Sequence, residues 1–232
     1  QALATLQHPA ASRPDMDWDL RNAQRISAYV SKIPEPAIRR LADYFFLQFE
    51  TEVVTKLNQL PLQICHNDGH RFSLLTDGRG QEARVTGVID FGDVVLTHAI
   101  CYLAVTISGL IVDQADLIGS AAKIVAGYHS VRPLAIAELE LIYHLVGTRL
   151  AIYAAMAGKA LADDPKNKHP QAKLEDVSRL LRRLLATSPV AWRQAMRSAC
   201  GVNLEASVID QDSQRLIDQR AHYFSPSLYT HY

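Results

Sequence analysis

Two acidic clusters carry the residue types in this sequence that could do chemistry. They read HNDGH at residues 66–70 and DFGD at residues 90–93, and each follows a short apolar run. A carboxylate at the end of a buried strand is costly to bury unless a metal ion or a substrate proton compensates its charge. The pattern therefore predicts one site that brings Asp68 and Asp90 together.

Asp68 and Asp90 have the types and the spacing that phosphoryl transfer requires. Such a reaction needs a carboxylate that orients the acceptor hydroxyl and takes its proton, and oxygen ligands for Mg²⁺ on the nucleotide phosphates. One aspartate with a weaker helper is enough for Mg²⁺, because water and phosphate oxygens complete its shell. A loop aspartate followed about twenty residues later by Asp-Phe-Gly is the arrangement found in kinases.

His66, Asp68 and His70 offer an alternative, a small transition-metal site. Histidine and aspartate are good ligands of Zn²⁺ and Fe²⁺, and alternate residues of an extended segment share a face. The sequence contains no His-Glu-x-x-His pair to complete such a site. A metal-dependent hydrolase therefore stays open as a second class of function, ranked behind phosphoryl transfer, which also explains Asp-Phe-Gly.

The two clusters resemble the catalytic motifs of the aminoglycoside phosphotransferase/choline kinase-like family, which is protein-kinase-like. The family's loop reads His-Gly/Asn-Asp-x-His/Asn-x-x-Asn before two apolar residues, and this sequence reads HNDGHRFSLL at 66–75. The second family motif, Ile-Asp-Phe-Gly/Glu-Asp, matches IDFGD at 89–93. The sequence DLRN at 19–22 is also similar to the branch that acts on amino alcohols such as hydroxylysine.

The resemblance implies a role for each motif residue. Asp68 would be the catalytic base, Asp90 the main Mg²⁺ ligand and Ser73 the second ligand. His66, His70 and Asp93 would support them, with His66 bracing the loop. ATP would donate the phosphoryl group, and the acceptor would be a small-molecule hydroxyl of the amino alcohol, hydroxylysine or aminoglycoside type. Asp163 and Asp164 are candidates for binding a substrate amine.

Two positions depart from the family pattern. Ser73 stands where the family has a metal-binding Asn, and Tyr102 stands where an Asp usually braces the catalytic loop. A hydroxyl is shorter than an amide and lacks its carbonyl oxygen. These differences favour an alternative hypothesis, a kinase-like lobe that has lost catalysis and acts as a binding or scaffold module in a multidomain protein.

The sequence shows no nucleotide-binding half. Before residue 60 there is no glycine, and the only lysines, Lys32 and Lys56, fall on or beside expected helices. Kinases hold ATP with a Gly-rich loop and a strand lysine in an N-terminal lobe. We therefore expect a C-terminal lobe, inactive alone, with an N-terminal kinase lobe elsewhere in the same polypeptide. Residues 220–228 resemble the entry segment of class III aminotransferases, which implies an aminotransferase domain as a further neighbour.

Charge and cysteine content exclude several partner classes. Lys and Arg together number 24, as do Asp and Glu, so no net field would recruit nucleic acid or an anionic membrane. The longest apolar run, 99–112, is too short to cross a bilayer. Three cysteines among apolar neighbours are typical of reduced thiols. We expect a cytoplasmic protein whose partner is a small molecule.

The elements that must position the clusters are mainly helices. Apolar periodicity predicts helices over about 17–33, 37–60, 97–112, 116–129, 134–162, 171–187 and 189–200. A strand, a loop and a short hairpin are predicted over 60–89. The expected fold is α+β and mainly α, a C-terminal kinase-like lobe whose small β-hairpin carries the motifs. The lobe would span 16–202, with an extended lead-in over 1–15 and a linker or tail over 203–232.

Overall fold

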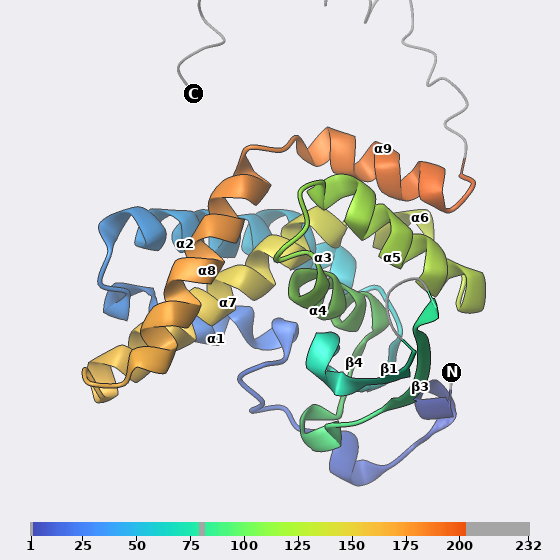
Figure 1. Ribbon diagram of the computed structural model, residues 1–232, viewed down its shortest axis with the longest axis horizontal. Coiled ribbons are helices and arrows are strands. Elements are labelled where there is room, and N and C mark those ends of the chain that lie inside the picture. The colour runs from blue at the N-terminus through green and yellow to red at the C-terminus, as the bar shows by residue number, and fades with distance from the viewer. Residues whose placement is uncertain (1, 79–81, 203–232) are drawn as a thin grey trace, which may run out of the picture.

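Helix α7 (Ile142–Asp163) is the centre of a mainly helical fold. The structure is a computed structural model and describes residues 2–78 and 82–202. Five helices pack against α7, namely α1 (Ala23–Ser27), α2 (Pro36–Gln48), α4 (Ala99–Leu110), α8 (Lys168–Leu185) and α9 (Pro189–Ala199) (Figure 1). Because α7 is apolar around most of its circumference, it is stabilised by burial on several sides. The expected α+β, mainly α class is confirmed.

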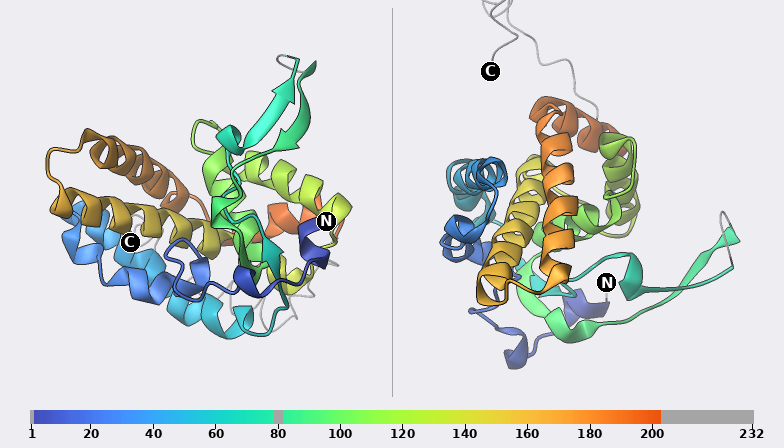
Figure 2. Two further views of the ribbon diagram at one scale, coloured as in Figure 1. Left: turned by 90° about the horizontal axis from the view of Figure 1, so that it is seen from below. Right: turned by 60° about the vertical axis from the view of Figure 1, so that its left-hand side comes forward.

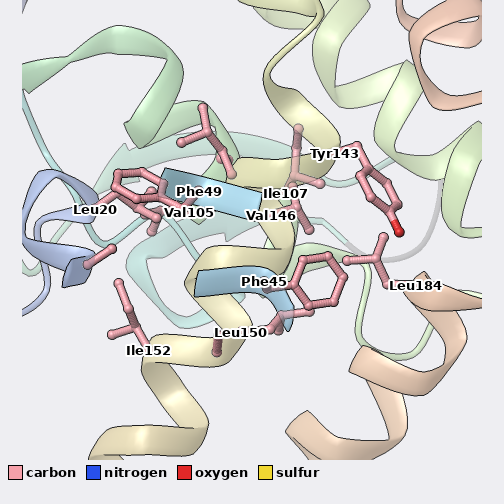
Figure 3. Close-up of a cluster of buried hydrophobic side chains, with 14 of the residues drawn as sticks. Leu20, Phe45, Phe49, Val105, Ile107, Tyr143, Val146, Leu150, Ile152 and Leu184 are labelled. Carbon is pink, nitrogen blue, oxygen red and sulfur yellow. The ribbon is translucent and has the colours of Figure 1, made fainter. Parts of the chain in front are cut away.

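The hydrophobic core follows α7 and joins helices that are far apart in the sequence. Phe45 from α2, Ile107 from α4, Leu150 from α7 and Leu184 from α8 are all buried (Figure 3). A Cβ at Gly147 would lie 2.1 Å from the Phe45 ring, so only glycine allows α2 and α7 to approach this closely. Two further helices, α5 (Leu117–Val131) and α6 (Ile136–Leu139), contact α9 and complete this side of the fold.

Within residues 2–78 and 82–202, the β structure consists of two separate antiparallel pairs of strands. The predicted hairpin is confirmed as β2 (Leu74–Asp77) and β3 (Arg84–Val88), and it projects from the helical body (Figure 2). The predicted first strand, β1 (Leu62–Cys65), pairs with β4 (Val95–His98), with Leu62 opposite His98. Strand β4 was not predicted, because its apolar residues run directly into those of α4. The expected helix over 97–112 therefore begins two residues later, at Ala99.

The helix predicted over 37–60 is three consecutive segments. Helix α2 is followed by a π-helical turn at Phe49–Val53 and by α3 (Val54–Leu57). The buried residues Phe45, Phe49, Val53 and Leu57 recur every four residues, which is slower than the 3.6-residue period of an α-helix. A wider π turn absorbs this difference and keeps all four on the core side. The helix predicted over 134–162 is likewise divided, into α6 and α7.

The N-terminal region is less regular than predicted. Residues 17–33 form α1 between two short 3₁₀ helices, Leu20–Asn22 and Val30–Lys32. The expected extended lead-in contains two more, Ala2–Thr5 and Pro9–Ala11. The expected tail over 203–232, its aminotransferase-like segment and the middle of the turn at 77–80 lie outside the described residues.

Helix α7 has the length and the apolar composition of a membrane-spanning helix. However, 67% of its most apolar window is buried inside the protein. That degree of burial is typical of the core helix of a soluble protein. The three cysteines, Cys65, Cys101 and Cys200, are free, as expected, and burial raises the pKa of the Cys65 thiol to about 12.

Burial of His98, the last residue of β4, should make the protein less stable in mild acid. It is 4% exposed, and burial lowers the pKa of its imidazole below the ordinary value of 6.5. The unfolded chain therefore binds more protons than the folded chain below pH 6.5, so the free energy of unfolding falls as the pH drops from 7 to 5. Urea titrations at both pH values should show a smaller fall for His98→Gln. An unchanged difference between the two pH values would contradict the assignment.

Candidate active site

The two acidic clusters meet in space. Strand β1 leads into the loop that carries Asp68 and His70, and β3 leads into Asp90. One side-chain ligand atom from each of these three residues lies within 4.8 Å of the other two. The sequence prediction that Asp68 and Asp90 come together is thus confirmed as geometry, and His70 joins them.

The backbone adopts a rare conformation at both clusters. Asn67 has a φ of 62° and Asp90 a φ of 66°, and these are the only non-glycine residues of 2–78 and 82–202 with a positive φ. A left-handed conformation costs about 1–3 kcal/mol outside glycine and concentrates at functional sites, although Asn and Asp tolerate it best. One strained residue directly precedes Asp68, and the other is Asp90 itself. The strain therefore marks both carboxylates.

His66 joins the two clusters from a buried position. Its Nε2–H donates to the Ile89 carbonyl at 2.8 Å, and its Nδ1 accepts the backbone N–H of Asp68 at 3.3 Å. Ile89 directly precedes Asp90, so one ring ties the loop to the second cluster. Because both ring nitrogens are already used, His66 has no lone pair for a metal. It braces the loop, and a transition-metal site using His66, Asp68 and His70 does not fit these bonds.

His70 is held in one tautomer by its own loop. Its Nδ1 accepts the backbone N–H groups of Phe72 and Ser73, both at 3.1 Å. The proton must then sit on Nε2, which lies 3.4 Å from the Asp68 carboxylate. In this state His70 orients Asp68 and offers no lone pair to the shared space. The two carboxylates are the groups here that fit a hard cation such as Mg²⁺.

Ser73 is placed differently from the second metal ligand that the resemblance implies. Its side chain is 1% exposed, and its Oγ accepts the His70 N–H at 2.9 Å. The same hydroxyl lies 2.8 Å from the His70 carbonyl and 3.1 Å from the Asp68 carbonyl, and it can donate to either. Ser73 therefore fixes the shape of the loop through hydrogen bonds to its own backbone.

The raised pKa of Asp93 reflects the negative charge of the neighbouring aspartates. Burial raises the pKa of its carboxyl above the ordinary value of 3.8, and the nearby Asp68 charge raises it further. Arg149 and Arg13 oppose that shift without cancelling it. Asp93 does not cap α4, whose N-cap is His98. A cation bound by Asp68 and Asp90 would relieve the repulsion between these carboxylates and Asp93.

Arg149 is the residue at this site that the sequence analysis missed. It lies on α7, is 1% exposed, and its Nη2 is 4.0 Å from the Asp68 carboxylate. Its Nη1 donates to the Trp18 carbonyl at 2.7 Å, and its guanidinium lies 5.0 Å from the Trp18 ring and 4.6 Å from the Tyr153 ring. The available signal was a lone arginine inside the apolar run HLVGTRLAIY. A buried guanidinium needs a reason, and Asp68 supplies one.

The N-terminal residues brace both clusters. The Trp18 carbonyl also accepts a hydrogen bond from the Asn67 side chain at 3.4 Å, so one carbonyl is shared by α7 and the loop that carries Asp68. Arg13 donates to the Gly92 carbonyl at 2.7 Å, next to the second cluster. The fully buried Asp19 accepts from Thr97 of β4 at 2.9 Å. The segment resembling the amino-alcohol branch is thus part of the support for the site.

Tyr102 supports the loop by packing. A Cβ at Gly69 would lie 3.2 Å from the Tyr102 ring and 2.3 Å from Thr106 Oγ1, so α4 lies directly against the loop. Asp163 and Asp164 are not near the cluster. Asp163 lies 14 residues beyond Arg149 on α7, about 21 Å away along the helix axis, and it pairs with Lys159.

Comparison with known proteins gives a family and a set of relatives. A family model described as a phosphotransferase enzyme family matches residues 1–134, which is more than half of the chain. The hydroxylysine kinase of Mus musculus is 28% identical over 177 residues, covering 72% of this chain and 47% of that protein. The hydroxylysine kinase of Xenopus laevis is 27% identical over 157 residues, covering 65% of this chain and 42% of that protein. The chain spans about half the length of these curated relatives.

Proposed function

Because the chain belongs to the phosphotransferase enzyme family, we propose that it is the catalytic lobe of an ATP-dependent kinase that phosphorylates a hydroxyl of a small molecule. The observation that carries the proposal is the convergence of Asp68 and Asp90 on one space. Asp68 would orient the acceptor hydroxyl and take its proton, held in place by His70 and Arg149. Asp90, with Asp93 beside it, would hold Mg²⁺, which neutralises charge on the ATP phosphates when bound.

The relatives suggest the acceptor class. Proteins named hydroxylysine kinase match most of this chain, so an amino alcohol of the hydroxylysine type is our first candidate, ahead of an aminoglycoside. Equal numbers of acidic and basic residues support a small-molecule partner over nucleic acid or a membrane surface. Three free thiols, two of them buried, support a cytoplasmic location.

The β2–β3 hairpin suggests where a nucleotide-binding lobe would dock. Large apolar side chains are exposed on and beside it, with Phe72 72%, Val85 61%, Phe91 50% and Leu75 47% exposed. A two-stranded hairpin is only marginally stable alone, and an apolar patch of this kind is typical of an interaction surface. We propose that an N-terminal kinase lobe of the same polypeptide covers it and holds ATP above Asp90.

Replacing Asp90 tests the metal assignment. In the full polypeptide that carries this lobe, Asp90→Asn should raise the Mg²⁺ concentration for half-maximal phosphate transfer by about tenfold or more, because a neutral amide binds Mg²⁺ more weakly. Asp77→Asn, at the end of β2 in the adjoining hairpin and outside the cluster, is the matched control and should leave the Mg²⁺ dependence unchanged. Wild-type Mg²⁺ dependence in Asp90→Asn would refute the proposal for this residue.

A catalytically inactive scaffold module is the second candidate. The observation in its favour is that the Ser73 hydroxyl forms hydrogen bonds within its own loop. A wild-type polypeptide that melts at a temperature independent of Mg²⁺ and ATP, and transfers no phosphate, would support the scaffold. Stabilisation by ATP only when Mg²⁺ is present would argue against it.

A further inference from the structure

An arginine from the start of the chain holds the turn that carries Asp90. We call residues 90–94 the Asp90 turn. The Nη1 of Arg13 donates to the Gly92 carbonyl at 2.7 Å and to the Val94 carbonyl at 3.2 Å. The N-terminal segment thus runs beside this turn (Figure 1). Because the donor is charged, both bonds are stronger than bonds between neutral groups.

The Asp90 turn depends on support from outside itself. Its backbone bond from the Val94 N–H to the Phe91 carbonyl is long, at 3.3 Å. The φ of 66° at Asp90 is a conformation that persists only where the surrounding structure enforces it. His66 fixes the chain on one side of Asp90 by donating to the preceding carbonyl at 2.8 Å. Arg13 provides the support on the other side.

Arg13 is itself held by the segment around it. Its neighbours Ala11 and Met16 are buried, each 7% exposed. The Asn22 side chain donates to the carbonyls of Pro14 and Met16, both at 2.8 Å. A side chain on an ordered segment loses less conformational freedom when it forms its bonds. The guanidinium of Arg13 is therefore an anchored support for the turn.

The charge of Arg13 and its hydrogen bonds affect a bound cation in opposite directions. The guanidinium bonds to a carbonyl only two residues after Asp90, so its positive charge lies near the carboxylates and repels a divalent cation. Loss of this charge alone would tighten cation binding. Loss of the two hydrogen bonds would loosen the turn that presents Asp90 and would weaken binding. The sign of the change in affinity shows which effect dominates.

We propose that Arg13 is a positioning residue for the metal site, which holds the Asp90 turn in the conformation in which Asp90 binds a divalent cation. The inference rests on the proposed function and gives a role in it to a residue outside both acidic clusters. Arg13 acts through the backbone and does not touch the cation or the substrate. Loss of such outer support typically lowers metal affinity by about tenfold to a hundredfold.

Binding of Mn²⁺ measures this role without any phosphate transfer. In the full polypeptide with ADP present, electron paramagnetic resonance of free Mn²⁺ should give a Kd about tenfold higher for Arg13→Gln than for wild type. Arg13→Lys keeps the charge on a shorter side chain, so it should recover only part of the affinity. Arg84→Gln removes an equal charge from the exposed start of β3, and as the matched control it should keep the wild-type Kd.

Hydrogen exchange tests the structural step in the absence of any metal. In the metal-free full polypeptide, residues 90–96 should exchange about tenfold faster in Arg13→Gln, because the bonds that hold two of their carbonyls are lost. Arg84→Gln should exchange like wild type. A thermal melt of Arg13→Gln within a few degrees of wild type would show that the effect is local. If Arg13→Gln does not fold, both measurements are made on Arg13→Lys.

The outcomes separate this inference from the proposed function. Unchanged exchange in Arg13→Gln would overturn the inference, as would an unchanged or lower Kd for Mn²⁺, or full recovery of affinity by Arg13→Lys. Wild-type Mn²⁺ binding together with unchanged exchange in the variant would keep the proposed function and remove the inference. A wild type that binds no Mn²⁺ would remove the metal site, and faster exchange in Arg13→Gln would then still establish Arg13 as the support of the turn.

Discussion

Asp68→Asn is expected to lower kcat for phosphate transfer by about 10³-fold, because an amide cannot take the proton of the acceptor hydroxyl. The measurement is steady-state kinetics of the full polypeptide with saturating Mg²⁺ and ATP. Asp43→Asn, an exposed aspartate on α2, is the matched control and should retain wild-type kcat.

The fall in kcat can be assigned to lost chemistry only if the Asp68→Asn protein remains folded. The Asp68 side chain is 21% exposed and lies 3.4 Å from His70 and 4.0 Å from Arg149, so the substitution weakens two long contacts. A thermal melt within a few degrees of wild type would show that the loss is chemical. Transfer at the wild-type rate by Asp68→Asn would contradict its role as the base and would leave the scaffold hypothesis or another base to be considered.

Arg149→Met is expected to lower kcat by about 10²-fold and to reduce the free energy of unfolding by about 1–2 kcal/mol. The stability loss follows because the Trp18 carbonyl would lose its shortest hydrogen bond, 2.7 Å from Nη1, while an apolar side chain of similar length keeps the packing. The larger effect on kcat follows because Trp18 also holds Asn67, directly before Asp68. A displacement of about 1 Å at a catalytic group can cost about 10²-fold in rate.

A conservative variant separates positioning from bulk stability for Arg149. Arg149→Lys keeps the charge but cannot reach both the Trp18 carbonyl and the Tyr153 hydroxyl, so it should recover only part of kcat. Arg40→Met, at an exposed position of α2, should leave both urea unfolding and kcat unchanged. Arg149→Met with reduced stability and wild-type kcat would show that Arg149 is structural only.

The sequence by itself determined the features that depend on neighbouring residues. The β-branched residues of β3 and the glycines of the turn before it predicted the β2–β3 hairpin. Pro36 and Pro189 stand at the starts of α2 and α9, as expected. The two motifs were also found in this way, because a strand that ends in a carboxylate is a local pattern. Even the strained residues have a local signature, since Asn67 and Asp90 are types that tolerate a positive φ.

Only the tertiary structure decided which side chains surround those carboxylates. Arg149 donates a hydrogen bond to Trp18, which is 131 residues away in the sequence. Strand β4, which follows the second acidic cluster, pairs with β1, which precedes the first. Ser73 looked like a metal ligand in the motif, yet three-dimensional contacts commit its hydroxyl to the loop. Periodicity reports only which face of an element is buried, and not which partner it is buried against. The charge around Asp68 therefore became visible only when Arg149 of α7 was packed beside the loop.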